Sequence, residues 1–355
     1  MTDQRLRVAV VGMGIGQLHV ASFKAVRDRF EIAVVCDAEE ARATSVVERL
    51  RGCYAETDFA AVCARDDIDI IDLCTPPFLH FEQAMQALEA GKHVICEKPL
   101  VDSLAEVDQL AEAERRNGRR VMPVFQYRFG HGLQKLRALV QAGATGAAHV
   151  TTVDLAWRRR PEYYAVPWRG RRETELGGVV LSHAVHVLDM VTYILGQPRR
   201  VFARTAVRVN DVETEDCASI SMEMGDGSLA TISATLGSVE EITRHRFCFE
   251  GLVAESNTEP YANSSDPWTF TPDTPEDGEL IQRVLETFEP QPEGYVAQFA
   301  GFHRALFEGG EPPVTLADAR AALEVVTAVY ASAAERRDVD LPLAADDPWV
   351  AGWNR

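Results

Sequence analysis

The chain has 355 residues, 46% of them hydrophobic and 25% charged, and a formal net charge of −18 at pH 7. This composition is typical of a soluble globular protein and excludes disordered and fibrous classes, and the length suits two domains with a core each. The negative charge repels a nucleic-acid backbone, and no stretch approaches the roughly 20 apolar residues that a membrane helix needs. We therefore expect neither a nucleic-acid nor a membrane partner.

Two features favour a cytoplasmic location. The N-terminal residues run directly into a predicted strand, which leaves no room for the three regions of a signal peptide. The seven cysteines form no CxxC pair, and several lie inside apolar runs. We interpret all seven as reduced, buried thiols.

Strands and helices alternate in the first third of the chain. Short apolar, β-branched runs predict buried parallel strands, and caps such as Ser103 with Glu106 predict where helices begin. The predicted strands are Leu6–Gly12, Glu31–Asp37, Ile68–Pro77, His93–Pro99 and Arg119–Gln126, and the predicted helices extend to about Arg29, over Phe81–Gly91 and from Ser103 to about Asn117. Repeated β-α-β units imply an α/β domain with a doubly wound parallel sheet over residues 1–125.

The pattern changes to closely spaced strands after residue 125. The predicted strands are His149–Arg158, Val201–Val209, Cys217–Met224, Ser228–Leu236 and Arg244–Gly251, with a hairpin turn at Gly225–Gly227 and one helix at Gly178–Leu195. The segment Glu255–Pro290 is rich in Pro, Asp, Thr and Ser, which predicts an ordered excursion or a loop, and two helices follow at about Tyr295–Phe307 and Leu316–Arg336. We expect a second, α+β domain over residues 126–355 with a mostly antiparallel sheet, and its last helices are candidates to pack back on the first domain.

A glycine-rich turn, Gly12–Gly16, links the first strand to the first helix. Glycines let the backbone approach a pyrophosphate, and the following helix offers unpaired N–H groups. The GxGxG pattern is one residue shorter than the usual GxGxxG and is weak by itself, but its position between strand and helix strengthens it. Asp37 ends the second strand, where a carboxylate accepts ribose hydroxyls and repels a 2′-phosphate. Asp37 therefore favours NAD over NADP, although it could also serve as a helix N-cap.

The string Cys96-Glu97-Lys98-Pro99-Leu100 follows the fifth strand. With the glycine turn, it resembles the Gfo/Idh/MocA family of NAD(P)-dependent oxidoreductases. The likeness covers nearly the whole chain, through His19, Thr75-Pro76-Pro77 with His80, Ala90–Pro99, Gln126–Phe129, Trp168-Arg169, Gly177-Gly178, His186, Asp189 and the segment GEPPVTLADARAALEVVTAVYASA. The resemblance implies a Rossmann domain followed by a domain with a large open sheet.

The resemblance also implies roles for single residues. Lys98 would be the catalytic lysine and His186 the histidine of the active-site helix. Ser182 stands four residues before His186, where relatives often carry Asp, so its part in a proton relay is open. The implied cofactor contacts are Gly12, Met13, Gly14, Ile15, Gly16, Asp37, Thr75, Pro76, Pro77, His80, Glu97, Lys98, Gln126, Trp168 and Arg169. The implied substrate contacts are Lys98, Tyr127, Arg128, Tyr164, His183 and His186.

Alcohol oxidation removes a hydride from carbon and a proton from oxygen. A partly desolvated lysine beside positively charged nicotinamide can give up its own proton near neutral pH. Lys98 would hydrogen-bond the reacting oxygen, and His186 would hold that oxygen and pass the proton outward. A mere surface lysine is the weaker interpretation, because Lys98 lies at the carboxyl end of a parallel strand, where such sheets bind ligands.

Two other clusters allow alternative interpretations. His183, His186 and Asp189 have a spacing that would suit zinc, but no further histidine or cysteine cluster completes a site, so we expect no metal. Six arginines form a basic island that would suit an anionic sugar, although a solvated loop or subunit contact is the better interpretation of such a run. They are Arg158, Arg159, Arg160, Arg169, Arg171 and Arg172.

We predict an NAD-dependent dehydrogenase or ketoreductase that acts on a ring hydroxyl of a sugar, sugar derivative or cyclitol. One alternative is an NAD-dependent glycoside hydrolase of the same family. Another is a non-catalytic dinucleotide-binding regulator, against which the presence of both Lys98 and His186 argues. An open sheet face needs cover, so we also expect a homodimer or homotetramer.

Overall fold

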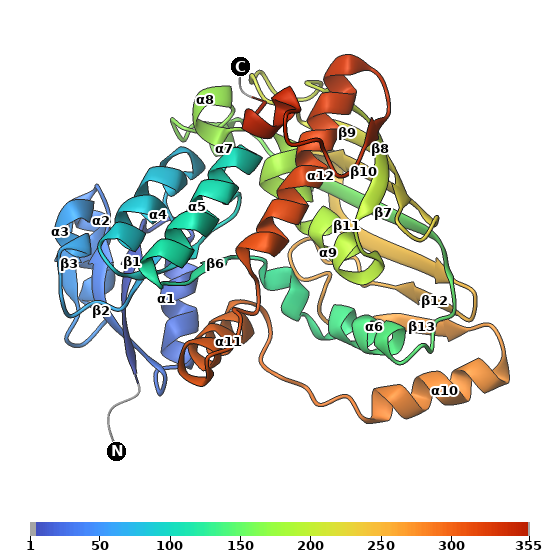
Figure 1. Ribbon diagram of the computed structural model, residues 1–355, viewed down its shortest axis with the longest axis horizontal. Helices are drawn as coiled ribbons and strands as arrows, with labels where there is room; N and C mark the ends of the chain where they lie inside the picture. The colour runs from blue at the N-terminus through green and yellow to red at the C-terminus, as the bar shows by residue number, and fades with distance from the viewer. Residues whose placement is uncertain (1–4, 354–355) are drawn as a thin grey trace. The chain divides into compact units, whose positions relative to one another are not determined.

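The computed structural model describes residues 5–353. The chain forms two compact units. The first contains residues 5–124 together with Tyr295–Arg320, and the second contains Phe125–Gly294 together with the residues from Ala321 onward. In Figure 1, the orange helix α11 (Gly294–Glu308) lies beside the blue helix α1 (Gly16–Ala25) of the first unit, although the two helices are far apart in the sequence.

The first unit is built on a six-stranded sheet in the order β3-β2-β1-β4-β5-β6, and all of its strand pairs are parallel. The strands are β1 (Leu6–Val11), β2 (Phe30–Cys36), β3 (Tyr54–Glu56), β4 (Ile70–Leu73), β5 (His93–Cys96) and β6 (Val121–Pro123). This order confirms the predicted Rossmann-type sheet. The prediction missed β3 and its flanking helices α2 (Glu40–Val47) and α3 (Phe59–Cys63), which are short and partly exposed.

Two further helices of the first unit lie close to their predicted positions, whereas α1, predicted to extend to about Arg29, ends at Ala25. Helices α4 (His80–Glu89) and α5 (Leu104–Asn117) lie side by side (Figure 1). The Ser103 hydroxyl accepts a hydrogen bond from the Glu106 backbone N–H at the start of α5, and Gly118 ends that helix with a φ of 60°. The predicted cap and stop are therefore confirmed.

Helix α11 completes the core of the first unit from late in the sequence. Phe299 and Phe302 are fully buried, and the Phe299 ring stacks on Phe23 of α1 with 4.3 Å between ring centroids. Gln298 donates a hydrogen bond to the Pro123 carbonyl at 2.7 Å. Burying two phenylalanines contributes several kcal/mol, on the order of 1.5–3 kcal/mol each.

The second unit is built on an eight-stranded sheet in the order β13-β12-β11-β7-β10-β9-β8-β14. Its strands are β7 (Ala148–Arg158), β8 (Pro198–Ala206), β9 (Cys217–Met224), β10 (Leu229–Thr235), β11 (Gly237–Phe249), β12 (Leu252–Glu255), β13 (Thr269–Pro272) and β14 (Val339–Asp340). Neighbouring strands are antiparallel except β7 and β10, which are parallel. The predicted α+β class with a mostly antiparallel sheet is confirmed.

The central helix of the second unit starts with a π-helical turn at Val180–Ala184 and continues as α9 (Val185–Leu195). By length and composition alone, Arg172–Leu195 could span a membrane, but 83% of its most apolar window is buried inside the unit, as in a core helix. The other helices are α6 (His131–Gln141), α7 (Pro161–Tyr164), α8 (Arg172–Glu175), α10 (Pro275–Glu286) and α12 (Leu316–Glu335), whose first residues belong to the first unit.

The prediction of an ordered excursion or a loop at Glu255–Pro290 is wrong only where the segment forms regular elements. This segment contains β13 and α10, a helix of 12 residues. Thr274 and Asp277 form a full capping box with a proline in the first turn, and Ile281 is buried. The sequence contains the residues of this capping box, but the acidic and proline-rich residues around them favoured the interpretation as a loop.

Candidate active site

The glycine turn has the geometry that a dinucleotide requires. Gly12 has a φ of +93°, and a Cβ atom there would lie 2.6 Å from the Cys74 carbonyl oxygen, so only glycine fits. A Cβ at Gly14 would meet nothing within 4 Å, which leaves that backbone open to a ligand. Helix α1 then begins without a side-chain cap, so its first N–H groups point into the same space. These features fit a bound pyrophosphate.

Asp37 lies directly after β2 and supports the glycine turn. One of its carboxylate oxygens accepts the Met13 backbone N–H at 2.7 Å, and the other accepts the Glu39 N–H at 2.9 Å. A carboxylate has about four acceptor positions, so ribose hydroxyls can share these oxygens. The hydrogen bond from the Glu39 N–H resembles that of a helix N-cap, which is the alternative interpretation of Asp37. Asp37 can therefore cap the helix and bind a ribose at the same time.

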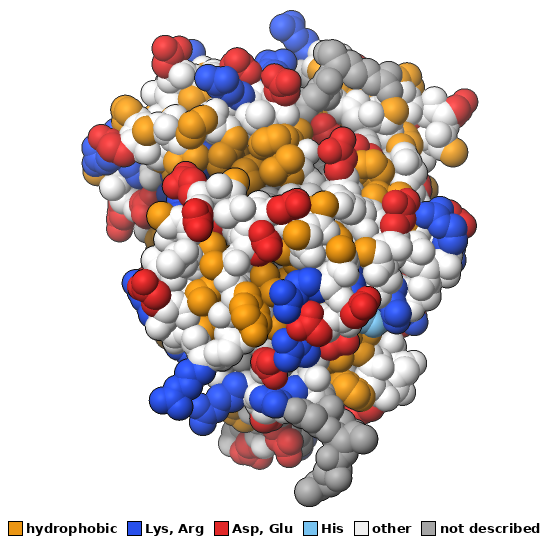
Figure 2. Space-filling view, turned by 90° about the vertical axis from the view of Figure 1, so that its left-hand side faces the viewer, with side chains coloured by type: hydrophobic (Ala, Val, Ile, Leu, Met, Phe, Trp, Pro, Cys, Tyr) orange, Lys and Arg blue, Asp and Glu red, His pale blue; other side chains and the backbone are white. Residues whose placement is uncertain are grey.

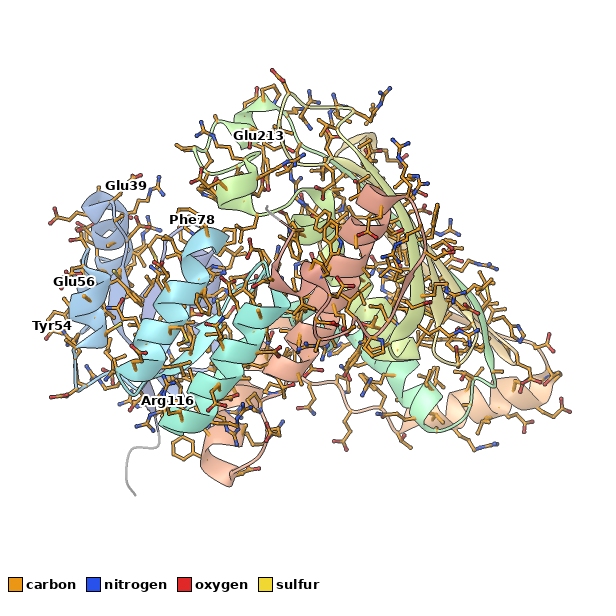
Figure 3. The ribbon with its side chains drawn as sticks, turned by 45° about the horizontal axis from the view of Figure 1, so that its top comes forward. Glu39, Tyr54, Glu56, Phe78, Arg116 and Glu213 are labelled. Atoms are coloured by element: carbon orange, nitrogen blue, oxygen red, sulfur yellow. The ribbon has the colours of Figure 1, made fainter. Side chains whose placement is uncertain are left out.

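More negative charge gathers at this end of the sheet. Figure 3 labels Glu39 and Glu56, which lie at the ends of neighbouring elements of the first unit. Burial, and then the carboxylates Glu56, Asp37 and Asp58, raise the pKa of Cys36 to about 12. A 2′-phosphate would therefore enter a region of like charge. On the face of the molecule drawn in Figure 2, acidic and basic side chains are mixed.

Lys98 is half-buried just beyond the carboxyl end of β5. Its backbone N–H donates to the Glu97 carboxylate at 2.9 Å. His80 lies on the other side of the motif, where its Nδ1 is 2.8 Å from the Pro99 carbonyl oxygen and its Nε2 is 2.8 Å from the Thr75 carbonyl oxygen. The residues flanking Lys98 are thus fixed by hydrogen bonds to buried side chains.

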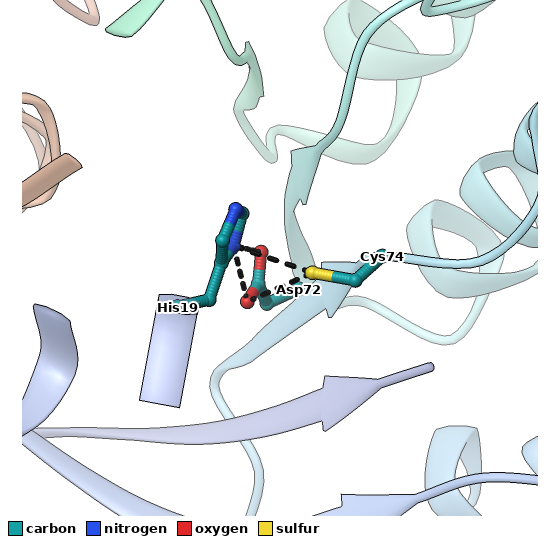
Figure 4. Close-up of side chains that lie close together, drawn as sticks. All are labelled: His19, Asp72 and Cys74. Carbon is teal, nitrogen blue, oxygen red and sulfur yellow. Dashed lines mark hydrogen bonds and ion pairs between the residues drawn. The ribbon is translucent and has the colours of Figure 1, made fainter. Parts of the chain in front are cut away.

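Glu97 belongs to a buried polar cluster, of which Figure 4 draws His19, Asp72 and Cys74. The His19 ring lies between two carboxylates, with Nδ1 at 2.9 Å from Asp72 and Nε2 at 3.0 Å from Glu97. The Tyr295 hydroxyl donates to the same Glu97 oxygen at 2.9 Å, and the Cys74 sulfur lies 3.3 Å from His19. His19, Asp72 and Cys74 are close enough together to suggest metal ligands. Their separations are hydrogen-bond distances, however, and both ring nitrogens of His19 already contact carboxylates.

His183 and His186 project from the central helix of the second unit, and both are at least 95% buried. The Tyr127 ring packs against His186 with 4.5 Å between centroids, while the Trp157 ring meets His183 edge-on at 5.3 Å. The predicted substrate residues Tyr127, His183 and His186 therefore lie around one part of this helix. Their role in substrate binding stays a prediction.

Asp189 lies one turn further along α9 and holds Arg128. The guanidinium donates to both carboxylate oxygens, with Nε 2.9 Å from Oδ2 and Nη2 2.6 Å from Oδ1. Both side chains are almost fully buried, and the Arg128 guanidinium also lies over the Tyr193 ring at 4.9 Å. This bidentate pair engages Asp189, which leaves the alternative zinc interpretation of the helix without its carboxylate ligand.

Ser182 contacts a carboxylate that the sequence did not single out. Its hydroxyl lies 3.4 Å from a Glu175 oxygen and 3.2 Å from the Gly177 carbonyl oxygen. Glu175 also accepts hydrogen bonds from the Gly170 backbone N–H and, at 3.3 Å, from Arg169. Burial, only partly offset by these bonds, raises the pKa of Glu175. A carboxyl group is thus present beside Ser182, although it comes from α8 rather than from position 182.

Several arginines of the basic island have acidic or carbonyl partners. Arg169 pairs with Glu175 and lies over the Trp168 ring at 4.2 Å. Arg158 donates to the Gly237 carbonyl and Arg172 to that of Glu213, while Arg159 lies 3.5 Å from Glu241. These partners favour the structural interpretation of the island. Tyr164 packs edge-on against Tyr163 with 5.0 Å between centroids, and Gln126 begins the 3-10 turn that contains Tyr127.

Three residues of these clusters, Asp72, Tyr295 and Glu175, were not predicted from the sequence. Asp72 had a usable signal, because a carboxylate in the middle of an apolar parallel strand requires a buried partner. Tyr295 and Glu175 had no such signal in the sequence. The partner of Tyr295, Glu97, is distant in sequence, and the partners of Glu175 are set by a local turn.

The comparisons with known proteins agree with this geometry. Residues 6–125 match a family model described as an oxidoreductase family with an NAD-binding Rossmann fold, and residues 133–251 match the GFO/IDH/MocA C-terminal domain. The chain belongs to the Gfo/Idh/MocA oxidoreductase family. Its first unit is therefore an NAD-binding Rossmann domain, and the chain is a dehydrogenase-type enzyme.

Relatives of this chain in the Gfo/Idh/MocA family are named as dehydrogenases of different compounds. D-glucoside 3-dehydrogenase of Escherichia coli (strain K12) is 32% identical over 203 residues, which span 56% of either chain. Myo-inositol 2-dehydrogenase of Thermotoga maritima is 27% identical over 347 residues, covering 95% of this chain and 98% of that enzyme. The WlbA dehydrogenase from Bordetella pertussis, crystallised with NADH and UDP-GlcNAcA, superposes with a TM-score of 0.85 at 25% identity, covering 96% of this chain and 100% of that one.

Proposed function

We propose that this protein is an NAD-dependent oxidoreductase that transfers a hydride between nicotinamide and a ring secondary alcohol or ketone of a sugar, sugar derivative or cyclitol. The observation that carries the proposal is Lys98. This lysine is half-buried at the carboxyl end of a parallel strand, on the same edge of the sheet as a glycine turn that fits a dinucleotide. Relatives named for a glucoside and for inositol, and a relative crystallised with UDP-GlcNAcA, support the substrate class.

In this function, each residue has a separate task. NAD, when bound, accepts the hydride from the carbinol carbon. Lys98 hydrogen-bonds the reacting oxygen and takes its proton or stabilises its charge. His186 contacts the same oxygen and passes the proton outward. Ser182, whose hydroxyl meets the Glu175 carboxyl group, is a candidate for the next position in that relay.

The test is a screen of sugars and cyclitols with NAD, followed by NADH absorbance. A substrate that reduces NAD, with one of its hydroxyl groups converted to a carbonyl group for each NADH formed, supports the proposal. Release of free sugar from a glycoside without net NADH would contradict it and would indicate a hydrolase instead. Dinucleotide binding without turnover of any compound would indicate a regulator.

We expect NAD to be preferred over NADP by at least about tenfold in kcat/KM, because Asp37 and its acidic neighbours repel a 2′-phosphate. The measurement is steady-state kinetics with both cofactors at one ionic strength. Asp37→Ser should reduce the preference for NAD, measured as the ratio of kcat/KM with NAD to kcat/KM with NADP. Glu112→Gln, on the exposed face of α5, should leave this ratio unchanged. Equal use of NADP by the unmodified protein would contradict the assignment of Asp37.

We also propose that the second unit associates with another copy through its open sheet face. Strand β10 alternates exposed and buried residues, and Leu229, Val150 and Phe202 are large apolar residues exposed on the sheet strands of the single chain. Light scattering at micromolar concentration is expected to give the mass of a dimer or tetramer. A stable monomer under those conditions would refute this assembly.

A further inference from the structure

The His19 ring lies between two acids in the interior of the first unit. His19 and Asp72 are 0% exposed and Glu97 is 4% exposed, so water screens none of these charges well. An ionised carboxylate only accepts hydrogen bonds, so a ring that contacts one carboxylate through each nitrogen must donate from both. With both carboxylates ionised, the geometry therefore requires an imidazolium, with one positive charge between two negative charges.

The electrostatics agree with this assignment. Burial opposes the charge of His19, but Asp72 and the neighbouring Cys74 outweigh it, and the pKa of His19 is raised well above its usual value. Burial alone would raise the pKa of Glu97. The hydrogen bond and charge of His19, followed by Lys98 and Tyr295, lower the pKa of Glu97 to about 2.

Several neighbours from different elements interact electrostatically with Glu97. His19 comes from α1, Tyr295 from α11, His80 from α4 and Cys96 from β5, while Cys74 follows β4 and Lys98 follows Glu97 directly. Among them, the hydrogen bond and charge of His19 lower the pKa of Glu97 the most. Glu97 thus depends on His19 to remain charged.

Glu97 acts on Lys98 in two ways. Its carboxylate accepts the Lys98 backbone N–H at 2.9 Å, which fixes where the side chain leaves the loop. Its negative charge also attracts the Lys98 ammonium group, an interaction that lowers the pKa of Glu97 itself. A change in the charge of Glu97 would therefore alter both the position and the protonation of Lys98.

We propose that His19 is a positioning residue: a permanently charged, buried imidazolium that keeps Glu97 ionised, so that Glu97 can hold Lys98 and set the charge around it. The proposal assigns a role to the fully buried His19 and Asp72 and to Tyr295. It rests on the proposed function only where it links Lys98 to catalysis. The coupling between His19, Glu97 and Lys98 exists in the free protein.

The variant that tests this is His19→Gln. Glutamine has no positive charge, so burial then dominates and Glu97 takes up a proton as the pH falls. We expect the ratio of variant to wild-type kcat to fall by about tenfold between pH 8 and pH 6, while NAD affinity changes little. His93→Gln is the matched control, because it removes a half-buried histidine at the start of β5, the end away from Glu97, and should leave the charge of Glu97 intact. Its loss of kcat should be the same at both pH values.

A second measurement needs neither NAD nor substrate. Trace acetylation of the free protein at pH 7, with Lys135 of the second unit as internal standard, reports how readily Lys98 loses its proton. Loss of the negative charge on Glu97 favours the neutral amine, so Lys98 should react several-fold faster in Glu97→Gln and, as Glu97 becomes protonated, in His19→Gln, but not in His93→Gln. Combining His19→Gln with Glu97→Gln should add nothing to Glu97→Gln alone.

These outcomes separate the two proposals. Faster acetylation in His19→Gln with unchanged turnover would support the coupling but remove Lys98 from catalysis. A pH profile and acetylation rate in His19→Gln equal to those of His93→Gln would overturn the role of His19. If His19→Gln does not fold, Tyr295→Phe, which removes one hydrogen bond to Glu97, should shift both measurements in the same direction by a smaller factor. No shift in that variant would overturn the proposal too.

Discussion

Replacing Lys98 with alanine is expected to lower kcat by about 10²–10⁴-fold, because the variant loses the group that takes the proton of the reacting alcohol. NAD affinity should stay nearly intact, since the glycine turn and Asp37 remain in place. Both quantities are measured on one preparation, kcat by NADH absorbance and affinity by fluorescence titration. Lys24→Ala, at an exposed position of α1, is the control and should match the wild type.

Ser182 and His186 test the rest of the relay. His186→Ala should also lower kcat, whereas Ser182→Ala should cost about tenfold or less, the value of one neutral hydrogen bond. Ser182→Asp places a carboxylate one helical turn before His186 and should shift the pH profile by favouring protonated His186. Wild-type turnover by Lys98→Ala would show that Lys98 is structural, and the proton acceptor would then be sought among His186, Tyr127 and Tyr164.

The second large effect concerns stability. Asp189→Ala is expected to lower the free energy of unfolding by about 3–5 kcal/mol, because it leaves the buried Arg128 guanidinium without its bidentate partner. Urea denaturation followed by circular dichroism gives this value. Glu279→Ala removes an exposed partner of Arg283 on α10 and should cost only about 0.3–0.5 kcal/mol.

A double variant tests the cause of that loss. Replacing both Arg128 and Asp189 with methionine and leucine removes the uncompensated charge and should recover most of the stability lost in Asp189→Ala. If the double variant is as unstable as the single one, the loss comes from packing rather than from the buried charge.

The sequence predicts the fold well wherever burial leaves a periodic pattern. The strands β1, β4 and β9 appear at or near their predicted positions because apolar, β-branched or alternating residues follow directly from which faces are buried. Helix α10 was not predicted because it is mostly exposed and only Ile281 is fully buried. A single buried side chain leaves no periodic pattern to recognise.

The candidate site is less predictable than the fold. The glycine turn and Lys98 belong to short continuous motifs, so the sequence alone indicates them. His19, Asp72 and Glu97 are separated by 53 and 78 residues along the chain, measured from His19. Their contact depends on the order of strands in the sheet, and the charges of the three groups depend on that contact.

The discontinuous first unit has a consequence for protein synthesis. A ribosome produces residues 5–124 long before it produces α11, yet Phe299 and Phe302 belong to that unit's core and Tyr295 to its polar cluster. The nascent Rossmann domain must therefore keep an apolar surface exposed while the 170 residues of Phe125–Gly294 are made. Such exposed surfaces are where chaperones bind and where aggregation begins. The last segment to emerge thus decides when the first domain is finished.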